Sequence, residues 1–152
     1  MQLSISKLFK SMLCGSAFFC FSTAVMANQN SPVGYWKIMD EETKQPASIV
    51  QITDNQDNLT GKVVKLLNNP DAICTKCSGE QQNKPILGMT ILWGFQAKND
   101  SFTEGKILAT RRGAIFDAGM QIAPDGQTLT LIVKTGFGKH KQVWQRVSNK
   151  NG

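Results

Sequence analysis

Hydrophobic and polar residues alternate along much of the chain beyond residue 33. Leu129, Leu131 and Val133, for example, alternate with a partly polar row made mostly of threonine. Neighbouring side chains of a strand point to opposite faces, so a period of two predicts strands with one buried face. Turn-forming clusters separate these segments. The predicted strands cover residues 34–39, 47–53, 59–66, 88–95, 101–108, 114–122, 127–134 and 140–147.

The segment 86–95 is apolar on both faces, which fits either a buried strand or a buried helix. No other stretch of a dozen residues beyond residue 33 has helical periodicity. The sequence therefore predicts an all-β protein of seven or eight short strands, which is typical of an antiparallel up-and-down barrel or a sandwich.

The two ends of this strand-rich region favour the barrel. Gly34 and Trp36 lie on the first predicted strand, and Arg146 lies near the end of the last. If these strands pair, the Arg146 guanidinium reaches the indole face of Trp36 in a cation–π contact. We therefore expect Gly34, Trp36 and Arg146 to close the barrel structurally rather than to bind a ligand.

Residues 1–27 have the features of a cleaved signal peptide. Lys7 and Lys10 form a positive start, an apolar stretch follows to about Val25, and small residues stand at positions 25 and 27. The apolar stretch is short for a membrane-spanning helix, so we do not expect a transmembrane anchor after processing. The remaining 28–152 then form a single β-barrel domain in the periplasm or outside the cell.

The net charge of the chain gives only weak information about its partners. The predicted leader holds two lysines and no acid, so the 15 Lys and Arg and 11 Asp and Glu that follow leave a net charge of +4. Such an excess gives weak attraction to an anionic surface of the cell envelope. Nucleic-acid binding is not expected, because no recognition motif is present.

Seven motifs stand in order along the chain: Gly34-Tyr35-Trp36, Ile49-Val50-Gln51-Ile52, Leu59-Thr60-Gly61-Lys62, Cys74-Thr75-Lys76-Cys77, Lys84-Pro85-Ile86-Leu87-Gly88-Met89, Gly105-Lys106-Ile107-Leu108 and Gln142-Val143-Trp144-Gln145-Arg146. Together they resemble one family of small exported bacterial proteins, the domain of unknown function 2147. The resemblance implies a lipocalin-like, calycin-type barrel in a bacterial periplasmic or outer-envelope setting, without established enzyme activity. One departure is the stretch after Leu108, where the family has an Asp-Pro and then an aromatic residue.

Cys74 and Cys77 form the one reactive-looking pair, in a long turn-like region at about 67–84. In an oxidising compartment such a pair is most often a structural disulfide, which for so small a loop contributes about 2 kcal/mol. A redox catalyst, a zinc site completed by His140 and further ligands, and free or intermolecular thiols are the alternatives.

Other catalytic chemistry has little support in the sequence. His140 is the single histidine of the chain, and the sequence contains no nucleophile motif such as Gly-x-Ser-x-Gly. The acids fall mostly in turns, and Glu104 and Asp117 alternate onto the outer face of their strands. We therefore expect no enzyme activity, no metal site and no cofactor.

Two functions fit this pattern. The first is a binding module that holds a small apolar or lipid-like ligand inside the barrel. The second is a structural or interaction protein of the envelope with a filled core, whose loop at 67–84 contacts a protein partner. The alternation is the same for a cavity and for a filled core. The residues expected to line a cavity are Trp36, Ile38, Val50, Ile52, Phe116, Met120, Leu129, Leu131 and Trp144.

Overall fold

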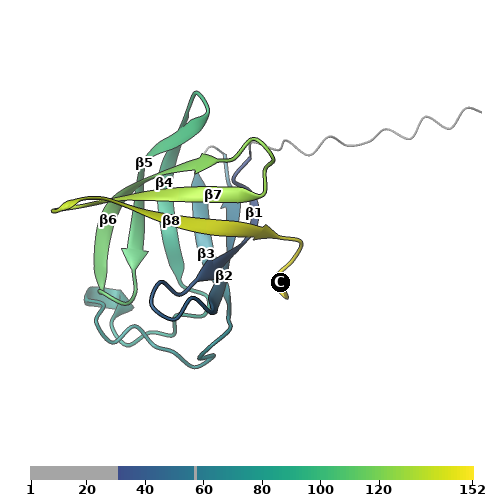
Figure 1. Ribbon diagram of the computed structural model, residues 1–152. Coiled ribbons are helices and arrows are strands. Elements are labelled where there is room, and N and C mark those ends of the chain that lie inside the picture. The colour runs from purple at the N-terminus through teal and green to yellow at the C-terminus, as the bar shows by residue number, and fades with distance from the viewer. Residues whose placement is uncertain (1–30, 57) are drawn as a thin grey trace, which may run out of the picture.

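The computed structural model describes residues 31–56 and 58–152 as one closed antiparallel β-barrel (Figure 1). Each strand pairs with the next along the chain, and the last pairs with the first, so the predicted up-and-down barrel is confirmed. The predicted signal peptide lies outside the described residues. The strands are β1 (Gly34–Met39), β2 (Pro46–Asp54), β3 (Leu59–Leu66), β4 (Thr90–Lys98), β5 (Ser101–Ala109), β6 (Ala114–Ile122), β7 (Thr128–Thr135) and β8 (Gly138–Val147), with a short 3-10 turn η1 (Gly79–Gln81).

The strand bounds differ from the predicted ones by at most three residues. The largest difference is at β4, which forms from the segment 86–95 that fitted either a strand or a helix. The helix alternative was therefore wrong. Relative to β3, β4 carries an extra residue near Gly94, whose φ is +74°. This bulge lets Leu92 and Phe95 both face the interior, three residues apart, and hides the period of two.

β1 and β8 pair as their sequences predict, with Trp36 opposite Arg146. The guanidinium carbon of Arg146 lies 4.2 Å from the centroid of the Trp36 ring. The indole N–H of Trp36 donates a hydrogen bond to the carbonyl of Pro32 at 2.7 Å. The segment before β1 is thereby held across this end of the barrel, which we call the sealed end.

Arg146 also ties together the backbone around the sealed end. Its side chain donates to the carbonyl oxygens of Gly126, Val33 and Ser31 at 2.5, 2.8 and 2.7 Å. A side chain at Gly34 would place its Cβ 2.6 Å from the Arg146 guanidinium, and the φ of Gly34 is +138°, so this position requires glycine. Burial lowers the pKa of the Arg146 guanidinium from its ordinary value.

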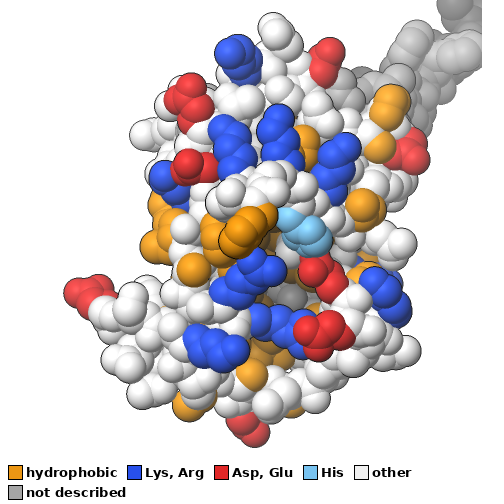
Figure 2. Space-filling view, turned by 60° about the vertical axis from the view of Figure 1, so that its left-hand side comes forward, with side chains coloured by type: hydrophobic (Ala, Val, Ile, Leu, Met, Phe, Trp, Pro, Cys, Tyr) orange, Lys and Arg blue, Asp and Glu red, His pale blue; other side chains and the backbone are white. Residues whose placement is uncertain are grey.

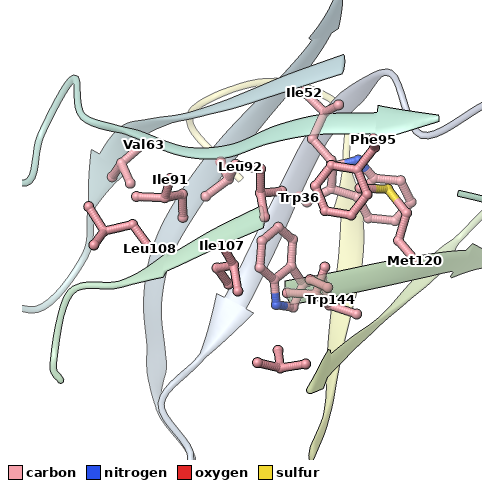
Figure 3. Close-up of a cluster of buried hydrophobic side chains, with 14 of the residues drawn as sticks. Trp36, Ile52, Val63, Ile91, Leu92, Phe95, Ile107, Leu108, Met120 and Trp144 are labelled. Atoms are coloured by element: carbon pink, nitrogen blue, oxygen red, sulfur yellow. The ribbon is translucent and has the colours of Figure 1, made fainter. Parts of the chain in front are cut away.

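The sealed end continues into a filled hydrophobic core. Trp36, Phe95 and Met120 cluster in this half of the barrel, with Trp144 beside them (Figure 3). Each of these four side chains is almost completely buried. Gly105 makes room for the core, because a Cβ there would lie 2.3 Å from the Phe95 ring.

Among the described residues, no helix is long and apolar enough to cross a bilayer.

Trp36→Ala should lower the free energy of unfolding by about 3–5 kcal/mol, because it removes a large buried aromatic side chain and the surface on which Arg146 rests. Tyr35→Ala is the matched control, because Tyr35 is the neighbouring residue on the opposite, outer face of β1 and is only partly buried. Chemical denaturation of both variants measures the difference. Equal, small losses for the two variants would contradict the placement of Trp36.

Candidate functional site

The end of the barrel opposite Trp36 carries the long connections and holds a cavity of about 290 Å³. The connections are residues 40–45, 67–89 and 110–113, together with the short turn between β7 and β8. The cavity is lined by residues of several strands and of these three longer connections. They are Ile38, Met39, Asp40, Glu41, Ala47, Ser48, Val63, Leu66, Ile86, Ile91, Ile107, Leu108, Ala109, Thr110, Arg111, Arg112, Phe116, Val133, Thr135, His140, Gln142 and Trp144.

Most of the cavity wall is apolar, and its charged side chains come from β8 and from the connections at the mouth. Val63, Ile91 and Leu108 belong to the same buried cluster as Trp36 but lie at its other end, where they line the cavity (Figure 3). On β8, by contrast, His140, Gln142 and Trp144 alternate onto the inner face and form a polar stripe along the cavity.

Trp144 stands at the inner end of this polar stripe. Its side chain is 1% exposed, and no described residue accepts a hydrogen bond from its indole N–H. A buried N–H without an acceptor costs about 1–3 kcal/mol. Trp144 therefore brings a buried donor without an acceptor next to the cavity that its side chain lines.

Charged side chains surround the mouth (Figure 2). An Arg111 Nη2 lies 3.0 Å from an Asp40 carboxylate oxygen and 3.6 Å from Glu42, and His140 Nε2 lies 2.6 Å from Glu41. In the strand order, the β1–β2 and β5–β6 connections lie on opposite sides of the barrel. The Arg111–Asp40 pair therefore reaches across the mouth. We call this pair and the Glu41–His140 pair together the ionic rim.

The carboxylates of the ionic rim are held in their charged form. The backbone N–H groups of Thr43 and Glu42 donate to Asp40 at 2.8 and 2.9 Å, and these bonds, the one from Thr43 first, lower the pKa of Asp40, to which Arg111 adds. The hydrogen bond with His140 lowers the pKa of Glu41. Both acids therefore stay ionised at neutral pH, and the mouth presents ion pairs around an apolar interior.

The sequence profile of one bacterial family, described as "Uncharacterized protein conserved in bacteria (DUF2147)", matches residues 34–146, which include every strand of the barrel but the last residue of β8. The chain belongs to the DUF2147 family. The resemblance seen in the sequence motifs is thus confirmed.

A solved structure extends the comparison to the fold. The protein HP1028 from Helicobacter pylori, which is assigned to the lipocalin family, superposes with a TM-score of 0.69 at 12% sequence identity. The match covers 80% of this chain and 86% of that one. At this identity the likeness shows a lipocalin-like fold. No functionally curated protein sequence matches the chain.

In this DUF2147 protein, the predicted cavity residues separate into two groups. Ile38, Phe116 and Trp144 line the cavity. The structure does not bring the other six to it, because alternation along a strand gives the inward face but not the depth along the barrel axis. These six lie in the filled core instead: Trp36, Val50, Ile52, Met120, Leu129 and Leu131.

The ionic rim was not singled out from the sequence. Asp40 and Glu41 are among the acids that fall in predicted turns, and the sequence around His140 shows no motif that links it to them. The one signal that could have found the rim is the family departure after Leu108, where Arg111 and Arg112 stand. The residues that depart from the family pattern form the β5–β6 turn at the mouth.

Cys74 and Cys77 form a disulfide, and both sulfurs are buried. The Cys74 Sγ lies 3.4 Å from the carbonyl oxygen of Thr110. Gly113 packs against the same loop, since its φ is +67° and a Cβ there would lie 1.8 Å from the Lys76 carbonyl oxygen. The disulfide loop is therefore docked on the β5–β6 turn that carries Arg111. Within the described ranges, no cluster of three or more His, Cys, Asp or Glu side chains could hold a metal ion.

Proposed function

We propose that this DUF2147 protein is an exported, non-enzymatic protein of the bacterial cell envelope that binds a small, mainly apolar ligand in the cavity. The observation that carries the proposal is the difference between the two ends of the barrel. One end is closed by Trp36 and Arg146, and the other opens onto an apolar cavity. A lipocalin-like barrel of eight strands is large enough to hold one small ligand.

The cavity limits the size and chemistry of the ligand. Its 290 Å³ is near the lower end of the usual range for ligand pockets and equals the liquid volume of roughly ten water molecules. The apolar wall favours a hydrocarbon body. A hydrogen-bond acceptor at the inner end of the ligand would supply the partner that the indole N–H of Trp144 lacks.

The same geometry supports a role in binding rather than in catalysis. The titratable groups at the mouth are engaged with one another, His140 with Glu41 and Arg111 with Asp40. Both pairs stand at the entrance, and the walls beneath them are mostly hydrocarbon. Such an arrangement can admit and orient an amphiphilic molecule.

A second candidate function is an envelope interaction protein that uses the long β3–β4 connection. Two of its apolar side chains, Ile73 and Leu87, are about half exposed. The disulfide fixes this loop on the barrel, so it could present these side chains to a protein partner. Loss of partner binding on Ile73→Ser and Leu87→Ser, with ligand binding intact, would favour this function over the first.

The export part of the proposal rests on residues 1–27. The intact mass of the protein recovered from cells that express the full chain should correspond to a start at or near Asn28. A mass that retains Cys14 would contradict cleavage at this site.

Ser48→Phe should abolish binding of an apolar probe, because Ser48 lines the cavity and a phenyl ring there occupies much of its 290 Å³. Fluorescence titration of the purified protein with a short-chain fatty acid probe measures the effect. We expect at least a tenfold loss of affinity.

Thr130→Phe is the matched control, because Thr130 lies on the outer face of β7, opposite Val143. It should bind the probe like the unsubstituted protein. Unchanged binding by Ser48→Phe in a folded protein would contradict the cavity as the binding site, and equal losses in both variants would do so too.

A further inference from the structure

The hairpin between β7 and β8 ends in an aromatic side chain that touches nothing around it. Phe137 stands at the turn and is fully exposed, at 106% of its reference area. The hairpin projects beyond the neighbouring strands in Figure 1. A turn between Gly136 and Gly138 needs no large apolar side chain, so neither the turn nor the core accounts for Phe137.

Three lysines flank this aromatic side chain on the outer face of the same hairpin. Lys134 pairs with Lys139 in the ladder, and Lys141 lies opposite Ile132. Their inward neighbours Val133 and His140 face the barrel. All three lysines are exposed, and none takes part in an ion pair with another described residue.

Several acids near the hairpin and the mouth pair with cations other than its lysines. Asp117 lies opposite Lys134 in the β6–β7 ladder and forms its ion pair with Lys106, and Lys106 first and Lys134 after it lower the pKa of its carboxyl group. Asp40 and Glu42 pair with Arg111, and Glu41 pairs with His140. The hairpin is therefore a basic surface with an aromatic tip. None of its three lysines forms an ion pair with a described carboxylate, and Asp117 opposite Lys134 offsets only part of the positive charge.

We propose that this hairpin docks on an anionic phospholipid surface, with Phe137 inserted among the acyl chains and Lys134, Lys139 and Lys141 against the headgroups. The spacing suits such a surface. At about 3.3 Å per residue, the lysines stand roughly 7–13 Å along the strands from Phe137, which compares with the depth of the headgroup layer and the range of its field. One protruding aromatic ringed by long cationic side chains matches a deformable lipid surface better than a shaped protein pocket.

Docking in this way would bring the cavity to the membrane. His140 lies three residues from Phe137 and lines the cavity, so the mouth opens beside the hairpin. The proposal nonetheless stands on the hairpin alone and does not depend on what the cavity holds. A loss of vesicle binding and a loss of ligand binding can therefore be told apart.

The test is sedimentation of the purified protein with vesicles of phosphatidylcholine alone and with vesicles of equal parts phosphatidylcholine and phosphatidylglycerol. We expect binding to the mixed vesicles that weakens as salt is raised. Each lysine near an anionic surface contributes about fivefold in affinity, so Lys134→Gln, Lys139→Gln and Lys141→Gln together should weaken binding about 100-fold. Phe137→Ser should weaken it about tenfold.

The control variant carries the same change of charge elsewhere, with Lys62, Lys98 and Lys150, all exposed, replaced by Gln. It should bind within a few-fold of the unsubstituted protein. The proposal is overturned if the protein binds phosphatidylcholine and mixed vesicles equally, or if the control loses as much as the hairpin variant. Binding that is unaffected by Phe137→Ser and equally tight to a soluble polyanion such as heparin would overturn it as well.

Discussion

The contact between the Arg146 guanidinium and the Trp36 indole is the constraint on which the rest of this barrel depends. It joins the first strand to the last, and the same guanidinium binds three carbonyl oxygens of the segments that cross the sealed end. A cation–π contact in a desolvated place is worth about 2 kcal/mol, and hydrogen bonds from a charged donor add to it. Arg146 thus holds together β1, β8, the segment before β1 and the turn between β6 and β7. All of these contacts lie at one end of the barrel, so the two ends are built differently.

That difference separates stability from function along the barrel axis. The core fills the half next to Trp36, so the opposite half can hold a cavity without loss of the fold. The ionic rim and the disulfide loop stabilise the connections at the open end, where strand pairing no longer does so. The exposed basic hairpin between β7 and β8 lies at this open end too, beside the mouth.

The sequence predicted the fold to within a few residues, because the alternation at Leu129, Leu131 and Val133 and the bracket of Trp36 and Arg146 are local signals of strand and closure. It did not predict how far along the axis each inward side chain lies. Leu131 and Phe116 both face inward, yet one packs in the core and the other lines the cavity. The ionic rim was missed for a related reason, since Arg111 and Asp40 are 71 positions apart in the sequence and meet only through barrel closure.

We infer that the barrel is sealed at one end and takes a ligand at the other. This can be tested by following the indole N–H resonances of Trp36 and Trp144 in protein labelled with ¹⁵N-tryptophan, during titration with a fatty acid probe. We expect the Trp144 resonance to shift as its N–H gains an acceptor, while that of Trp36, whose N–H already donates to the Pro32 carbonyl, stays in place. A shift of Trp36 equal to that of Trp144, or no shift of either while the probe binds, would contradict this inference.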